Sequence, residues 1–76
     1  MGRVKSRGRI SNNLRRLRFE HDEMTQQALA ELIGVTRQTV VAIEGDKYSP
    51  SLEVAFRIAT AFGVSIDDVF AYDPDG

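Results

Sequence analysis

A chain of 76 residues has room for one small domain, which buries only about 60% of the surface that its unfolded chain exposes. It contains no cysteine, which excludes a disulfide framework, a thiolate zinc site and a cysteine nucleophile. No apolar run approaches the roughly 20 residues of a transmembrane helix, so we expect a soluble cytoplasmic protein.

The net charge of −1 hides a strong asymmetry between the two ends of the chain. Residues 1–9 carry four bases and no acid, whereas residues 66–76 carry four aspartates and no base. One end can therefore meet a polyanion that the other end avoids. We divide the chain into a basic, flexible N-terminal arm at 1–9, a domain at 10–72 and a short acidic tail at 73–76.

The first predicted helix follows the arm. Ser11 or Asn12 can cap it, and it runs to about His21 with Leu14 and Leu17 on one face.

Two short helices come next, at residues 26–33 and 37–44. Thr25 and Thr36 are good N-caps for them, and Gly34 stands where a helix end needs a left-handed residue. Their inward positions are Leu29, Ala30, Ile33, Val40 and Ile43.

Two further helices complete the chain, capped by Ser51 and Ser65, with Gly63 between them. The apolar positions expected on the first are Leu52, Ala55, Phe56, Ala59 and Phe62, and those on the second are Ile66, Val69 and Phe70. No segment shows useful strand alternation, so the predicted fold is all-α with five short helices.

The stretch "TQQALAELIGVTRQTVVAIE" predicts a specific relation between the second and third helices. Ala30 is small enough for the third helix to pass close to it, and Gly34 makes the tight turn between them. This is the helix-turn-helix arrangement.

The sequence resembles the phage-repressor and Cro-type helix-turn-helix family, often called the XRE family. The motifs "NNLRRLR", "TQQALAELIGVTRQTVVAIE" and "YSPSLEVAFRIATAFGVSIDDVF" match its pattern in order. The resemblance implies a compact five-helix repressor-like domain that binds double-stranded operator DNA as a homodimer. We expect no cofactor, no membrane and no small-molecule ligand. Three departures from the family pattern stand out. The loop at 19–24 is about one residue longer, Glu44-Gly45-Asp46 replaces Glu-Asn-Gly or Glu-Lys-Gly, and the basic arm at 1–9 lies outside the shared core.

In such motifs the N-terminal end of the third helix contacts base edges in the major groove. The residues expected to do so are Arg37, Gln38 and Thr39, with Thr36 at the cap. Arginine suits guanine and glutamine suits adenine. Val41 and Ala42 lie further along, and Val41 either touches a thymine methyl group or is simply exposed.

Phosphate contacts are expected at both flanks of that helix. Gln26 and Gln27 begin the second helix, where free backbone N–H groups attract anions, and Lys47 and Ser49 follow the third. The resemblance singles out Gln26 as a phosphate clamp. It also matches Arg18 and Glu44 to a structural ion pair between the first and third helices. Arg15 and Arg16 are expected to stay solvated or to add general attraction to DNA.

Two further expectations concern the ends. Arg7 and Arg9 can enter an adjacent minor groove, as arms of other helix-turn-helix proteins do, or remain solvated. Ile66, Val69, Phe70 and Tyr72 either close the thin core or form a dimer interface, and the resemblance favours dimerisation.

An enzyme is not expected, because His21 is the only histidine and the adjacent Asp67 and Asp68 point in different directions on a helix. The main alternative is a protein-interaction module or antitoxin-type partner with the same fold. Repression, by covering a promoter, is the expected outcome of DNA binding.

Overall fold

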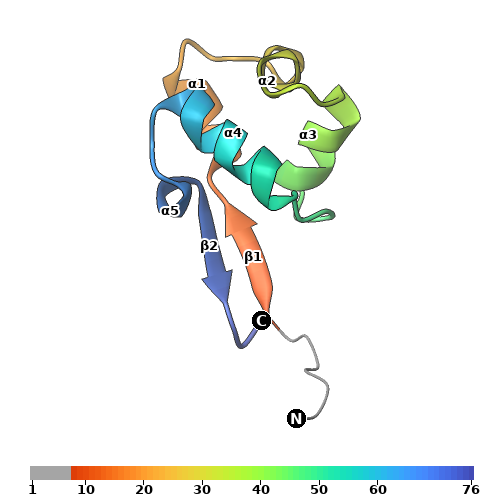
Figure 1. The fold of residues 1–76 in the computed structure, drawn as a ribbon, viewed down its shortest axis with the longest axis vertical. Coiled ribbons are helices and arrows are strands. Elements are labelled where there is room, and N and C mark those ends of the chain that lie inside the picture. Colours follow the sequence, from red (N-terminus) through yellow and green to blue (C-terminus); the bar gives the residue numbers. More distant parts are fainter. Residues whose placement is uncertain (1–7) are drawn as a thin grey trace.

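A computed structural model describes residues 8–76, which form five helices and one two-stranded sheet (Figure 1). The helices are α1 (Leu14–Glu20), α2 (Gln26–Ile33), α3 (Arg37–Glu44), α4 (Leu52–Phe62) and α5 (Ile66–Val69). The strands are β1 (Arg9–Asn12) and β2 (Phe70–Asp73). No helix in this part of the chain has the length and apolar character needed to cross a membrane.

The predicted helix starts of α2, α3 and α4 are confirmed by their caps. The Thr25 hydroxyl oxygen accepts from the backbone N–H of Ala28 at 2.9 Å, and Thr36 accepts from Thr39 at 3.1 Å. Ser51 caps α4 in the same way. Each bond satisfies a donor that the first turn of a helix leaves unpaired, so these polar residues fix where the helices begin.

Glycine ends α2 and α4 as expected. Gly34 has φ 76° and Gly63 has φ 68°, in the left-handed region that residues with a Cβ atom seldom enter. At Gly34 a Cβ atom would also lie 3.2 Å from the Arg57 guanidinium. The turn between α2 and α3 therefore depends on glycine for its conformation, and a larger residue would also make the Arg57 side chain shift slightly.

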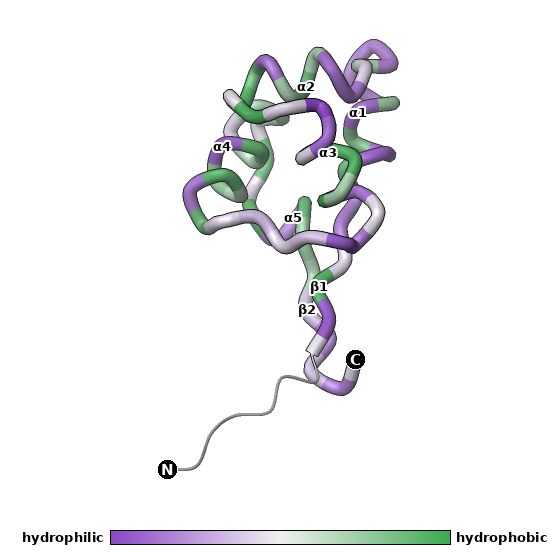
Figure 2. The backbone as a smooth tube through the Cα atoms, turned by 90° about the vertical axis from the view of Figure 1, so that its right-hand side faces the viewer, coloured by the Kyte–Doolittle hydropathy of each residue, from purple (hydrophilic) through white to green (hydrophobic). Residues whose placement is uncertain are grey.

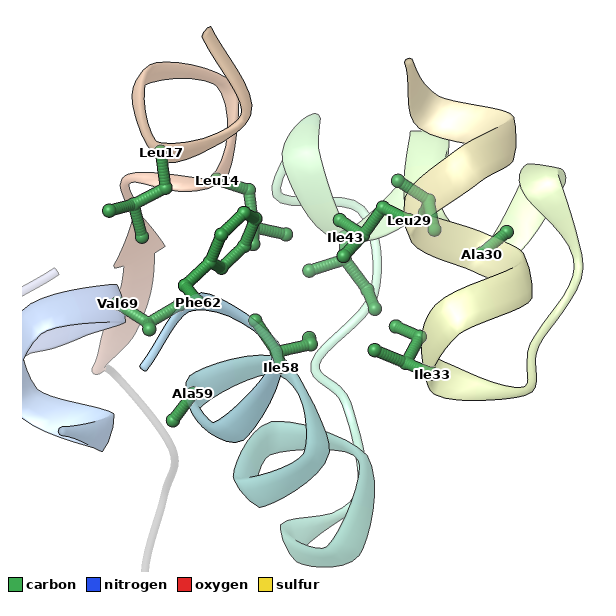
Figure 3. Close-up of a cluster of buried hydrophobic side chains, with 11 residues drawn as sticks. Leu14, Leu17, Leu29, Ala30, Ile33, Ile43, Ile58, Ala59, Phe62 and Val69 are labelled. Atoms are coloured by element: carbon green, nitrogen blue, oxygen red, sulfur yellow. The ribbon is translucent and has the colours of Figure 1, made fainter. Parts of the chain in front are cut away.

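The helices enclose a single apolar core (Figure 3). Its buried members are Leu14, Leu17, Leu29, Ala30, Ile33, Val40, Ile43, Ile58, Ala59, Phe62 and Val69. Every helix contributes to this cluster, so α2 and α3 are held against the same apolar centre as α1 and α4. Truncating a buried leucine or isoleucine in such a core typically costs about 2–5 kcal/mol of stability.

The prediction for α4 was partly wrong. Leu52 is 70% exposed and Phe56 is 54% exposed, whereas Ile58, which was not predicted, is fully buried. The buried face of α4 runs through Ala55, Ile58, Ala59 and Phe62. A second apolar stripe on the same helix, Leu52 and Phe56 one turn apart, is thus left on the surface.

The expectation of no strand was also wrong. β1 and β2 pair antiparallel, with Arg9 opposite Asp73 and Ile10 opposite Tyr72. This terminal sheet (β1 with β2) leaves the helical body as a narrow extension (Figures 1 and 2). Each strand has only four residues, too few to give a recognisable alternation of apolar and polar side chains. Nearly the whole domain also separates the two strands along the chain, so no local signal indicates that they pair.

The terminal sheet shifts the boundaries that were expected at the two ends. Ser11 lies within β1 and caps no helix, and α1 begins only at Leu14. Arg9, assigned to the arm, and Asp73, assigned to the tail, are both strand residues. Residues 1–7 of the expected arm lie outside the described part of the chain.

Candidate DNA interface

The N-terminal end of α3 presents four polar side chains. Thr36 and Thr39 are tied to each other, because their hydroxyl oxygens lie 2.9 Å apart and Thr36 also caps the helix. Arg37 and Gln38 are exposed and make no side-chain hydrogen bond or ion pair with any residue from 8 to 76. The hydrogen-bond donors of Arg37 and Gln38 therefore have no partner within the described fold.

A polar network holds the other end of α3. Arg18 Nε lies 2.6 Å from Glu44 Oε2, and Arg18 Nη2 lies 3.0 Å from Glu44 Oε1. The remaining Arg18 nitrogen donates to the Met24 carbonyl oxygen at 2.7 Å. The side chains of Arg18 and Glu44 are only 15% and 10% exposed. This two-point contact joins α1 to the last residue of α3.

Gln26 belongs to the same network. Its Nε2 donates to Glu44 Oε1 at 3.1 Å, and the residue is half-buried at the start of α2. Gln27 is exposed and donates to Glu31 at 2.9 Å. Lys47 and Ser49 are exposed in the loop after α3. The four residues expected to contact phosphate therefore lie on the α2 start and the α3–α4 loop, and Gln26 has one N–H already engaged.

A hollow between α1 and the starts of α2 and α3 brings three arginines together. It is lined by Arg15, Arg18, Arg37, Thr25, Gln26, Gln27 and Glu44. Glu44 and Arg18 form an ion pair, so the net positive charge of this hollow comes from Arg15 and Arg37. Arg15 was expected to be solvated or only generally attractive. Its spacing of three residues from Arg18 places it on the same side of α1, a signal that the sequence does contain.

The residues expected at a dimer interface do not share one environment. Val69 is fully buried in the protomer's own core, which removes it from any interface with a second copy. Ile66 and Phe70 are half-buried, and Tyr72 is exposed. A second hollow, lined by Ile10, Pro50, Leu52, Ala55, Ile66, Asp67, Phe70, Ala71 and Tyr72, joins the terminal sheet to α4 and α5.

Of the two arginines expected in a minor-groove arm, Arg7 lies outside the described residues. Arg9 is held in β1 opposite Asp73, so it belongs to the sheet and not to a free arm.

A short helix packed across a second one, with unpartnered polar side chains at the start of the second, defines the helix-turn-helix class of DNA-binding domains. The helix-turn-helix family model matches residues 14–69, from the first residue of α1 to the last of α5. The chain belongs to this family, in its XRE-type branch.

Curated relatives are similar over most of their length. An uncharacterized HTH-type transcriptional regulator of Methanocaldococcus jannaschii is 50% identical over 66 residues, covering 87% of this chain and 98% of the relative. Another, of Methanothermobacter thermautotrophicus, is 56% identical over 54 residues, covering 70% and 78%. The uncharacterized HTH-type transcriptional regulator YgzD of Bacillus subtilis is 44% identical over 61 residues, covering 80% and 91%.

Proposed function

We propose that this protein is a sequence-specific transcriptional regulator that inserts α3 into the major groove of an operator as a homodimer and represses transcription. The observation that carries the proposal is the contrast between the two ends of α3. Its C-terminal end is fixed by the Arg18–Glu44 pair, while Arg37 and Gln38 at its N-terminal end are exposed and unpaired within the described fold.

The chemistry of these side chains suits base edges. Arg37 can donate two hydrogen bonds to guanine O6 and N7, and Gln38 can pair with adenine N6 and N7; each such contact contributes about 1–3 kcal/mol of base discrimination. Thr39 and Thr36 are already bonded to each other. Their remaining surface offers a hydroxyl oxygen or a methyl group, which suits a secondary contact to a base edge.

Phosphate contacts would surround the bases. Gln26 and Gln27 at the start of α2 line the same hollow as Arg15, so an anion bound there would meet both hydrogen-bond donors and positive charge. Lys47 and Ser49 would contact the strand on the other flank of α3. Because Gln26 donates to Glu44, we propose that its role is to hold the helix start as well as to contact phosphate.

The homodimer would form through the sheet face, which we define as Ile10, Leu52, Ile66, Phe70 and Tyr72 around the apolar hollow. Leu52 and Tyr72 are large and exposed, and burying them offsets the thin core of a small domain. To read half-sites on successive turns of DNA, such a dimer would present its two copies of α3 on one side, about 34 Å apart. A dimer bound to an operator in the cytoplasm would most simply repress transcription by blocking RNA polymerase.

The proposal is tested by titrating the purified protein against a labelled DNA fragment from upstream of its own coding sequence, with random DNA as competitor. A saturable shift that survives competitor supports an operator in that fragment. Binding that competitor removes completely would place the operator elsewhere. No binding to any DNA, even at low salt, would contradict the regulator and favour the protein-interaction module.

A further inference from the structure

We propose that Asn12 is a positioning residue that couples the terminal sheet to α3 and thereby sets the half-site spacing that the dimer accepts. This inference rests on the proposed dimer through the sheet face. It assigns a role to a residue that lies outside the proposed DNA contacts and outside the sheet face.

Asn12 makes three hydrogen bonds to three different parts of the fold. Its Oδ1 accepts from the backbone N–H of Leu14 at 3.0 Å, at the start of α1. Its Nδ2 donates to the Ile43 carbonyl oxygen at 2.9 Å and to Asp46 Oδ1 at 3.1 Å. The residue itself is the last of β1 and lies opposite Phe70 of β2. One half-buried amide thus joins the terminal sheet, α1 and the last turn of α3.

The hydrogen bond from Asn12 to Ile43 lies in the turn that ends α3. The Ile43 carbonyl oxygen also accepts from the backbone N–H of Asp46 at 3.1 Å, so Asn12 reinforces the turn that ends the helix. One residue further, Glu44 is held by Arg18 of α1. The end of α3 is therefore fixed against α1 by a charged pair and against the sheet by Asn12.

A small tilt of α3 about its C-terminal end would produce a larger displacement of Arg37 at its N-terminal end. An eight-residue helix is about 12 Å long, so a tilt of about 10° about its C-terminal end would move Arg37 by about 2 Å. In a symmetric dimer both copies of α3 would move, changing their separation by up to about 4 Å, which is comparable to the 3.4 Å rise of one base pair. Loss of the Asn12 contact should accordingly relax the preference for one half-site spacing.

The neighbouring residue provides a matched control. Asn13 Nδ2 donates to the Asp68 carbonyl oxygen at 3.0 Å, which joins the start of α1 to α5, and the Asn13 side chain makes no hydrogen bond to α3. Asn12→Ala and Asn13→Ala thus each delete an amide that donates to a distant backbone carbonyl, but only the first removes a hydrogen bond to α3.

The test uses duplexes carrying an operator that wild-type protein selects from a random-sequence library. Affinities are measured for the selected spacing, for spacings one base pair shorter and longer, and for a single half-site. We expect wild type and Asn13→Ala to favour the selected spacing by about tenfold or more, and Asn12→Ala to lose most of that preference while its half-site affinity stays within about twofold.

Other results would overturn the inference. If Asn12→Ala keeps the spacing preference of Asn13→Ala, the coupling does not exist. If wild type binds two half-sites no better than one, the dimer proposal fails, and this inference fails with it. If Asn12→Ala does not fold by circular dichroism, Asn12→Ser replaces it, since its hydroxyl oxygen can still accept from Leu14 but the side chain is too short to reach Ile43. An unchanged spacing preference in that variant would overturn the coupling equally.

Discussion

Arg18 and Glu44 meet in a two-point contact that joins α1 to the last residue of α3, with Nε–Oε2 and Nη2–Oε1 distances of 2.6 Å and 3.0 Å. Removing one partner leaves the other charge largely buried. We expect Arg18→Ala to lower the free energy of unfolding by about 3 kcal/mol, near the lower end for a buried pair because some water reaches both groups. Urea denaturation measures this change.

The exposed pair of Arg16 and Glu20 is the control. Their atoms lie 3.8 Å apart, both side chains are more than half exposed, and Arg16→Ala should change stability little. Replacing both partners, as in Arg18→Met with Glu44→Leu, should recover much of the loss. A double variant as unstable as Arg18→Ala would show that the contact to Met24, not the ion pair, carries the effect.

Gln38 is expected to contribute to specificity and not to general affinity. Because its side chain makes no hydrogen bond in the described fold, Gln38→Ala should leave stability unchanged and lower affinity for an operator by about 5- to 150-fold, which corresponds to about 1–3 kcal/mol. Fluorescence anisotropy with operator and scrambled duplexes separates the loss of sequence-specific affinity from any loss of general DNA affinity. An equal loss on both duplexes would assign Gln38 to phosphate.

Arg15 should behave in the opposite way. It lines the hollow at the start of α2, so Arg15→Ala should weaken binding to operator and scrambled DNA alike. The slope of log affinity against log salt concentration should fall by about 0.9, the value for one phosphate contact. Arg16 does not line that hollow. Equal slopes for Arg15→Ala and Arg16→Ala would mean that Arg15 only adds general charge.

Dimerisation is tested at the sheet face. Tyr72→Asp puts a charge on a side chain that is 65% exposed in the protomer, and it should convert the dimer to a monomer in sedimentation velocity. Phe19 has a matched exposure of 66% on α1, away from the sheet face, so Phe19→Asp should leave the dimer intact. Wild-type protein that sediments as a monomer at high concentration would refute the interface.

Backbone strain in the longer loop after α1 predicts a stabilising change. Glu23 has φ 52°, in the left-handed region that costs most residues about 1–2 kcal/mol. Glu23→Gly relieves this cost and adds the entropy penalty of glycine, so we expect a net gain of about 0.5–1 kcal/mol and a melting temperature higher by several degrees. Glu23→Ala keeps the strain of the left-handed backbone. A similar gain in stability from Glu23→Ala would show that removing the Glu23 charge, and not relieving the strain, is responsible.

The helical part of this fold is predictable from local signals. Thr25, Thr36 and Ser51 cap helices, and Gly34 ends one, because each effect depends on a few adjacent residues. The terminal sheet is not predictable in this way. Arg9 and Asp73 pair across almost the full chain, and strands of four residues carry too little pattern to indicate a partner.

The candidate site shows the same division. The positions of Arg37 and Gln38 follow from the spacing of the helix-turn-helix motif. The contact of Gln26 with Glu44 and the hollow that Arg15 lines depend on how three helices meet. Asn12 is the clearest case: the sequence suggests a helix cap, and only the fold shows that its amide reaches Ile43, 31 positions away.

Parallel selections from a random-sequence DNA library by wild-type and Arg37→Ala protein test whether the N-terminal end of α3 contacts base edges. We expect a two-fold-symmetric motif for wild type, and for Arg37→Ala the same motif with the preference at one guanine position of each half-site lost. Identical motifs from both proteins, or no enriched motif from wild type, would contradict it.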